Sequence, residues 1–227
     1  MKTFFCLALF ILGFNLQAQY RYGPIAQLGL SHIWTDYDAD LQEQERFLGA
    51  AYSLGVFAER SLSEKSNLGF SLNLQQIGSK EKTIGPYYKI PANNRDYQDL
   101  RTEHRLLGYL SLPIYYSYNL DKFQLQLAWN TSLLLAYYVR TEYAWRRDNG
   151  EAHPAGEDQF YRLSPNNLAY KYLDFGPQVA LLYSLSDRLQ VQASYYHGLQ
   201  QIIYEGISSE AYIRSLQFGF RWVINEE

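Results

Sequence analysis

Residues 173–199 read LDFGPQVALLYSLSDRLQVQASYYHGL, which indicates two β-strands joined by a tight turn at Ser186-Asp187. Apolar residues occupy alternate positions in both arms: Leu173, Phe175, Val179, Leu181 and Tyr183, then Leu189, Val191, Ala193 and Tyr195. The positions between them hold mainly Gln, Ser, Gly and Asp, with almost no Lys or Glu. Since alternate residues of a strand share a face, this pattern predicts lipid on one side and a narrow polar lumen on the other.

Seven connections divide the chain into eight alternating segments. The segments are 22–34, 47–59, 67–78, 105–118, 123–140, the two arms above, and 212–224. Short turns at 60–66, 119–122 and 185–188 alternate with long loops at 35–46, 79–104, 141–166 and 198–211. The sequence therefore predicts an all-β fold, an eight-stranded antiparallel up-and-down transmembrane β-barrel with short periplasmic turns, long extracellular loops and periplasmic termini.

Aromatic residues support this layout, because membrane barrels carry an aromatic belt at each interface. In the predicted register the loop-end belt contains Trp34, Tyr137, Tyr172, Tyr195 and Tyr212, and the turn-end belt contains Tyr118, Phe123, Tyr183 and Trp222. The competing interpretation is a secreted lipocalin-like barrel with the apolar set inside. In both, Pro113 and Pro177 fall in mid-strand, which predicts bulges or local breaks in the ladder.

The N-terminus has the features of a secretory signal peptide: Lys2, an apolar run from Phe4 to Phe14, and a polar segment ending at Ala18. We expect cleavage to leave a mature domain of residues 19–227, inserted in the outer membrane. Cys6, the only cysteine, would leave with the signal, so we expect no disulfide, thiolate nucleophile or thiolate metal site. The net charge of −3 gives no footprint for nucleic acid.

Three local patterns resemble the PorT-like family of outer-membrane β-barrel proteins. They are Tyr109-Leu110-Ser111-Leu112-Pro113-Ile114, Asp174-Phe175-Gly176 and Ser194-Tyr195-Tyr196-His197-Gly198-Leu199. The likeness covers nearly the whole mature chain, and it implies an eight-stranded outer-membrane barrel. The namesake of the family takes part in type IX secretion, so the resemblance implies a link to protein secretion.

An enzymatic alternative would need a nucleophile, a base and an acid in contact. Strand parity places His32 and His197 on the outer face, while His104 and His153 fall in loops, so no histidine projects into the lumen beside a Ser and a carboxylate. The segment 36–40 spaces aspartates as calcium loops do, but Leu41 and Phe47 stand where an EF-hand needs Gly and Glu. We expect no catalytic residue, cofactor or metal, with loose divalent binding at this acidic loop as the alternative.

Four charges face inward by parity: Glu59, Arg140, Asp174 and Arg221. Because a buried lone charge is costly, we expect Arg140 and Asp174 to form an ion pair at the loop-side mouth of the lumen. An eight-stranded barrel is just wide enough to be filled by side chains, which favours a plug over a small channel.

Segments 79–104 and 141–166 mix aromatic and charged residues, as protein interfaces do. The candidate partner-contact residues are Tyr87, Tyr88, Tyr97, Tyr143, Trp145, Phe160 and Tyr161. The alternative is a pair of variable surface loops. We expect a non-enzymatic barrel that anchors, binds or assembles components of the cell envelope. Its expected partners are outer-membrane lipid, lipopolysaccharide and other envelope proteins; a lipid-modifying enzyme and a small channel remain the alternatives.

Overall fold

The computed structural model of the protein describes residues 20–37, 43–90, 95–147, 152–162, 172–201 and 209–225. Within these ranges every strand belongs to one antiparallel sheet. The strands are β1 (Tyr20–Tyr37), β2 (Glu43–Ser63), β3 (Ser66–Ile90), β4 (Arg95–Leu120), β5 (Phe123–Arg147), β6 (Ala152–Arg162), β7 (Leu173–Ser184), β8 (Leu189–His197), β9 (Ser209–Trp222) and β10 (Ile224–Asn225). Among the described residues, no helix is long and apolar enough to cross a bilayer.

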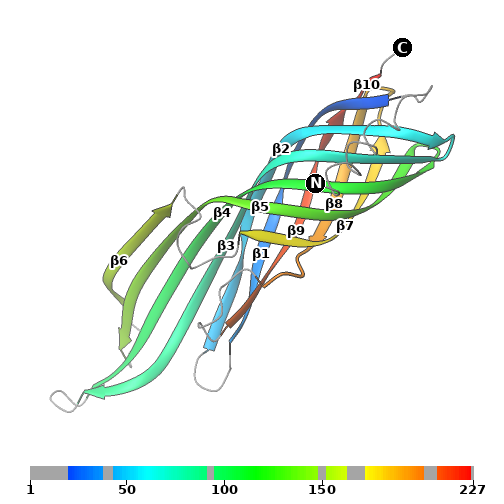
Figure 1. Ribbon diagram of the computed structural model, residues 1–227. Coiled ribbons are helices and arrows are strands. Elements are labelled where there is room, and N and C mark those ends of the chain that lie inside the picture. The colour runs from blue at the N-terminus through cyan, green and yellow to red at the C-terminus, as the bar shows by residue number, and fades with distance from the viewer. Residues whose placement is uncertain are drawn as a thin grey trace.

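The sheet closes on itself because β9 pairs with β1, from Ile25 opposite Arg221 to Tyr37 opposite Ser209. The ring follows the order β1-β2-β3-β4-β5-β7-β8-β9, while β6 pairs with β5 and the short β10 with β1 outside this path. Figure 1 shows the resulting tilted barrel. The predicted eight-stranded up-and-down barrel is therefore confirmed, whereas the predicted signal peptide, residues 1–18, lies outside the described residues.

The strand register fixes the width of the barrel. If one follows the paired residue from each strand to the next around the ring, starting at Tyr20, the path returns to β1 at Leu30. The stagger of the closed sheet is therefore ten residues. The partners on the way are Arg60, Leu68, Tyr116, Leu127, Val179, Tyr195 and Leu216. With ordinary strand spacings, eight strands and this stagger give a tilt of about 40° and a radius of about 8 Å. Side chains fill an interior of that width.

The two faces of the wall differ as a membrane barrel requires. Leu28 is 71% exposed, and the outer positions at mid-height are similarly open and apolar: Leu54, Leu74, Leu127, Leu181 and Phe218. The inner positions are buried and polar: Gln27, Ser53, Ser111, Asn130 and Gln192. This arrangement contradicts the lipocalin-like alternative, which places the apolar set inside.

The turns at one end of the barrel are tight. Only Glu64 and Lys65 separate β2 from β3, and only Asp121 and Lys122 separate β4 from β5. Asp121 has a φ of 52°, a left-handed conformation that Asp and Asn tolerate better than most residues. Tyr20 lies opposite Arg60 near the first of these turns, so both described ends of the barrel chain are on the turn side, as predicted.

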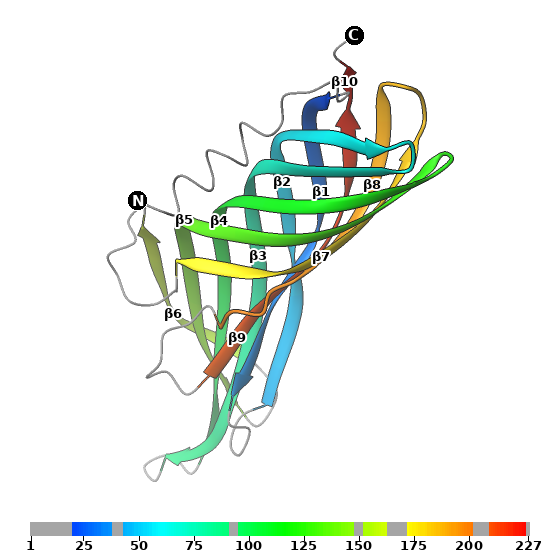
Figure 2. The same ribbon diagram turned by 45° about the vertical axis from the view of Figure 1, so that its right-hand side comes forward.

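The two longest predicted loops are largely strand, which corrects the sequence interpretation. Residues 79–90 and 95–104 continue β3 and β4 as a paired ribbon, and residues 141–147 of β5 pair with β6. The ladder between β4 and β5 runs without interruption from Gly108 opposite Ala136 to Tyr97 opposite Arg147. Figures 1 and 2 both show these strands extending well beyond the barrel. Alternation was obscured here because charged residues fill both faces once the strands leave the membrane.

A bulge in β5 reverses which face of the sheet each residue after Leu135 occupies. Tyr109 pairs with Leu134 and Gly108 with Ala136, so Leu135 is an extra residue without a partner on β4. As a result Tyr137 is buried and Val139 packs against the core, although strand parity predicted both on the outer face. Tyr137 therefore does not belong to the loop-end aromatic belt.

The two mid-strand prolines are accommodated without a bulge. The β3–β4 ladder skips the positions between Phe70 opposite Ile114 and Asn73 opposite Ser111, yet the register continues across the gap. Pro113 is thus matched with Asn130 on β5 but makes no bridge to β3. Pro177 pairs with Trp129, and the β7–β8 ladder begins one residue later at Gln178. The sequence predicted either a bulge or a local break at each proline, and both prolines are accommodated by a local break.

The lumen changes chemistry along its length. Apolar side chains from β1, β3, β4, β5, β8 and β9 meet at its loop end, and they are Ile33, Ile77, Leu107, Tyr109, Leu134, Tyr137, Tyr196, Ala211 and Ile213. Polar side chains fill the half nearer the turns. The apolar group forms a plug, and the bulge at Leu135 supplies one of its members by turning Tyr137 inward.

Candidate functional site

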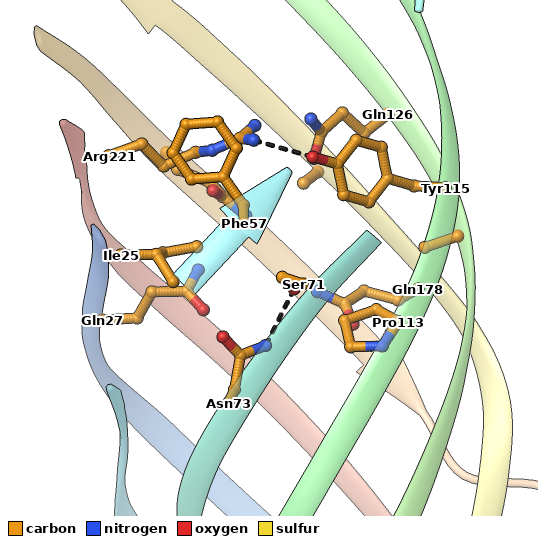
Figure 3. A pocket seen from close by; sticks show the side chains of 13 residues that line it. Ile25, Gln27, Phe57, Ser71, Asn73, Pro113, Tyr115, Gln126, Gln178 and Arg221 are labelled. Atoms are coloured by element: carbon orange, nitrogen blue, oxygen red, sulfur yellow. Dashed lines mark hydrogen bonds between the residues drawn. The ribbon is translucent and has the colours of Figure 1, made fainter. Parts of the chain in front are cut away.

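The polar half of the lumen is filled except for water-sized gaps. A cavity of about 20 Å³ is bounded on several sides by Gln27, Asn73, Pro113, Tyr115 and Arg221 (Figure 3). A second cavity of about 10 Å³ shares three of these residues, Gln27, Asn73 and Pro113. Spaces of this size hold one or two water molecules. The described part of the lumen therefore has no continuous path wide enough for a solute.

A buried charge cluster closes the turn end of the lumen. The Arg221 guanidinium lies 3.3 Å from Glu59 Oε2 and donates a 2.8 Å hydrogen bond to the Tyr115 hydroxyl. Tyr115 in turn donates to Glu59 Oε2 at 3.2 Å, and the Arg21 guanidinium approaches Glu59 Oε1 at 3.1 Å. Phe57 completes the site, since its ring centroid is 3.7 Å from the Arg221 guanidinium carbon. Two inward charges found by strand parity, Glu59 and Arg221, thus neutralise each other.

The structure contradicts the predicted ion pair between Arg140 and Asp174. Asp174 lies opposite Ser132, and its Oδ2 accepts a 2.7 Å hydrogen bond from the buried hydroxyl of Tyr196. Arg140 is eight residues farther along β5, a distance of roughly 27 Å in an extended strand. Its guanidinium contacts Glu142 at 3.1 Å and Glu157 at 2.8 Å instead.

The bulge at Leu135 explains the part of this error that concerns the face on which Arg140 lies. Without it, parity counted up β5 places Arg140 on the lumen face; with it, Thr141 takes the buried inner position and Arg140 becomes exposed. The hydrogen bond to Glu157 raises the pKa of the Arg140 guanidinium above its usual value. Arg140 therefore acts on the outer surface of the extended strands, far from Asp174.

The extended strands form what we term the projecting sheet, residues 43–47, 79–90, 95–105, 138–147 and 152–162. Its inner face continues the lumen face and carries an ion cluster. Arg105 approaches Glu81 Oε2 at 3.0 Å with both side chains almost fully buried, and it also contacts Glu103. Arg101, more exposed, pairs with Glu103. Two acids and two bases thus balance at the loop-side mouth.

The projecting sheet carries a second network beside a groove. Glu142 pairs with Arg140 and lies 3.9 Å from His104 Nε2. A groove of about 660 Å³ runs along this region, formed by β4, β5 and β6; its lining residues are Thr102, Glu142, Tyr143, Ala144, Ala152, Pro154, Gly156 and Glu157. Because the strands supply the walls, the groove is built on rigid elements rather than on a loop.

The predicted partner-contact residues all fall on the projecting sheet. Tyr143 lines the groove and is 37% exposed. Trp145, two residues farther along β5, is half-buried. The backbones of the other five lie in strands, Tyr87 opposite Gln98, Tyr88 opposite Tyr97, and Phe160 and Tyr161 on β6 opposite Val139 and Tyr138. Their side chains are outside the described residues.

Sequence reasoning missed Glu81 and Arg105. Glu81 lies in segment 79–104, which was predicted as a loop, and Arg105 is the first residue of the predicted strand segment 105–118. The signal was present, because the charged residues Arg101, Glu103 and Arg105 recur with period two, and Arg105 pairs with Glu81 across the ladder.

The histidines and acidic residues do not gather into a metal site. Among the described residues, no group of three or more His, Cys, Asp or Glu side chains converges to hold a metal ion. His32 and His197 both lie opposite Arg214 at the loop end, and His104 is on the projecting sheet. Of the acidic segment 36–40, residues 38–40 lie outside the described residues, as does the side chain of Asp36.

Comparison with known proteins adds likeness of fold alone. No protein-family model and no curated protein sequence matches the chain, so the PorT-like resemblance stays a prediction. The chain is similar in structure to Neisserial surface protein A, with 12% identity over 89% of this chain and 97% of that one and a TM-score of 0.36. It is also similar to the outer membrane protein OprG from Pseudomonas aeruginosa, with 9% identity over 91% and 96% and a TM-score of 0.38.

A third similar structure is the outer membrane protease OmpT from Escherichia coli, with 9% identity over 93% of this chain and 99% of that one and a TM-score of 0.36. Identities and TM-scores this low carry no argument about what the present chain does. The fold itself, an antiparallel β-barrel of the outer-membrane type, follows from the strand register and the apolar outer wall.

Proposed function

We propose that this protein is a non-enzymatic component of the outer membrane that holds a protein partner on its projecting sheet. The observation that carries the proposal is the continuation of β3, β4 and β5 beyond the barrel, joined by β6, to form a groove of about 660 Å³. A barrel that only filled a membrane would gain nothing from these strands. They position exposed aromatic and charged side chains on a stiff support, which favours specific contact.

The chemistry of the groove indicates the kind of partner. Glu142 and Glu157 contribute carboxylates, Tyr143 contributes an exposed ring, and Arg140 is engaged with both acids. An extended segment with apolar and basic side chains would match this surface. Beside the groove, β6 pairs only with β5 among the described strands, so its other edge is available for main-chain hydrogen bonds.

The absence of a catalytic mechanism is part of this proposal. Asp174 and Tyr196 are buried in the lumen, and the cluster of Glu59, Tyr115 and Arg221 is likewise closed to a substrate. The resemblance to PorT-like proteins, stated from sequence, supports a role in an envelope assembly such as type IX secretion. Insertion in the outer membrane is supported by the apolar wall and the one-sided placement of the turns.

A groove variant tests the proposal against a matched control. Tyr143→Ser removes an exposed ring in the groove, and Tyr118→Ser removes a similarly exposed ring at the turn end of the barrel. Each tagged variant would be purified from native membranes in mild detergent, and co-purifying proteins would be quantified by mass spectrometry. Heat-modifiable gel migration would confirm that both barrels are folded.

We expect one envelope protein to be enriched with the wild type and with Tyr118→Ser, and to fall at least fivefold with Tyr143→Ser. A second variant shortens the β5–β6 hairpin by removing residues 143–156, so that Glu142 is followed directly by Glu157, its partner across the ladder. This deletion should abolish the enrichment. Equal recovery from all four proteins would contradict the proposal, as would a change in lipid composition on deletion of the hairpin without any bound protein.

A further inference from the structure

A cluster of basic side chains surrounds one exposed tryptophan at the loop end of the barrel wall. The guanidinium carbon of Arg46 lies 4.8 Å from the centroid of the Trp34 ring, and that of Arg214 lies 5.0 Å from the same centroid. The His32 ring is 6.1 Å away from the indole, and both guanidiniums are close enough to act on it electrostatically. We term His32, Trp34, Arg46 and Arg214 the basic–aromatic patch.

The β1–β9 ladder places this patch at a definite height. Opposed outward pairs succeed one another up the wall: Ala26 with Phe220, Leu28 with Phe218, Leu30 with Leu216, His32 with Arg214, and Trp34 with Tyr212. The first three pairs are apolar, and the leucines and phenylalanines among them are exposed. His32 and Arg214 thus form the first polar step beyond the apolar band, where lipid headgroups lie.

The electrostatics of the patch favour an anion. An aromatic face attracts a guanidinium but does not neutralise its charge. Arg214 makes no ion pair with a carboxylate of any described residue, and its buried Nε donates no hydrogen bond there. A ligand that places negative charge beside Arg214 would neutralise this guanidinium.

We propose that the basic–aromatic patch binds the phosphate of a lipid headgroup in the leaflet on the loop side, through Arg46 and Arg214. Two oxygens of a phosphate monoester match the planar fork of a guanidinium, and Trp34 holds two such forks at the same end of the wall. Trp34 supplies a stiff support and an apolar flank for the adjoining sugar or glycerol. In a Gram-negative outer membrane the matching headgroup is that of phosphorylated lipid A.

The source of the phosphate follows from the height of the patch. A soluble phosphate would need no apolar wall directly below its site, whereas a lipid headgroup must have its acyl chains beside exposed residues such as Leu30 and Leu216. The inference shares with the proposed function only the insertion of the barrel in the outer membrane. It is independent of the groove and of any protein partner.

The test compares lipid binding by the refolded full-length mature protein in phosphatidylcholine nanodiscs, with EDTA present to prevent bridging by divalent cations. Binding of purified lipid A would be measured by native mass spectrometry for the wild type and for R46Q/R214Q. Arg188→Gln is the matched control, because Arg188 is an exposed arginine at the turn end. Dephosphorylated lipid A and inorganic phosphate serve as the comparison ligands, and gel migration before and after boiling shows whether each variant is folded.

We expect lipid A to bind the wild type and the Arg188→Gln control equally, and R46Q/R214Q about 25-fold more weakly. Each basic side chain near an anionic membrane surface contributes about 1 kcal/mol, which corresponds to about fivefold in affinity. Dephosphorylated lipid A should bind all three proteins alike. Equal lipid A affinity for R46Q/R214Q and the wild type would overturn the proposal. Competition by inorganic phosphate at equal molar affinity would overturn the assignment to a lipid.

One further variant removes two carboxylates from the strand ends beyond the patch. The backbones of Asp36 and Glu210 pair with each other two residues beyond Trp34 and Tyr212. If Arg46 and Arg214 bind the lipid phosphate directly, D36N/E210Q should bind lipid A as tightly as the wild type or more tightly. Weaker binding by D36N/E210Q, equal to that of R46Q/R214Q, would show that the arginines only order this part of the wall, and direct phosphate contact would then be wrong.

Discussion

Removal of the Glu59 carboxylate should reveal how strongly the turn-end charge cluster holds the barrel closed. The side chains of Glu59 and Arg221 are 0% and 1% exposed, and they come from β2 and β9, which are separated in the ring only by β1. In Glu59→Gln, Arg221 keeps the Tyr115 hydroxyl and the Phe57 ring but loses its only ion pair among the described residues. We expect the free energy of unfolding to fall by about 3 kcal/mol, because a charge is then left buried and unneutralised.

Arg221→Met should cost less. Glu59 keeps Arg21 at 3.1 Å, and that guanidinium is partly exposed, so the remaining carboxylate stays neutralised. A loss of about 2 kcal/mol is expected for this change, discounted for the retained partner and solvent screening. In the double variant no buried charge is stranded, so the loss should be about 3 kcal/mol rather than the sum of about 5, a coupling of about 2 kcal/mol.

Reversible urea unfolding in lipid vesicles, followed by tryptophan fluorescence, measures all four stabilities. Glu64→Gln provides the matched control, since Glu64 carries the same charge on the exposed turn between β2 and β3 and makes no described ion pair. Additive losses in the double variant would refute the reasoning, because they would mean that Glu59 and Arg221 do not interact. A loss of less than 1 kcal/mol for Glu59→Gln would refute the claim that the buried guanidinium depends on this carboxylate.

Two further predictions concern the wall and the lumen. Leu28→Arg, at an outward position that is 71% exposed, should lower the free energy of unfolding in bilayers by about 2–4 kcal/mol, while the same change at Leu62, near the turn, should cost less than 1 kcal/mol; equal costs would show that the outer wall does not face lipid. Planar-bilayer recording of the pure protein should show no steady single-channel current, because the described part of the lumen has water-sized cavities of about 20 and 10 Å³ and an apolar plug; a large stable conductance would contradict a filled lumen.

The sequence by itself determined the class of fold, because side-chain chemistry with period two is a local property of each strand. Leu28, Leu54 and Phe218 are apolar between polar neighbours, and the wall exposes them as the alternation predicted. Parity also found Glu59 and Arg221 as inward charges, and turn length ordered the strands into an up-and-down ring. These conclusions need only the pleat of a strand and the cost of burying charge.

The tertiary structure alone decided what depends on register and on distance. Leu135 has no partner on β4, and this one extra residue turns Tyr137 inward and Arg140 outward. The predicted pair of Arg140 and Asp174 also fails on distance, because Asp174 lies opposite Ser132, eight residues before Arg140 on β5. Nothing local in the sequence marks the bulge, because its place is set by how β4 and β5 are staggered around a closed ring. The same holds for the contact of Arg46 and Arg214 with Trp34, since the closure of β9 on β1 brings together residues far apart in the chain.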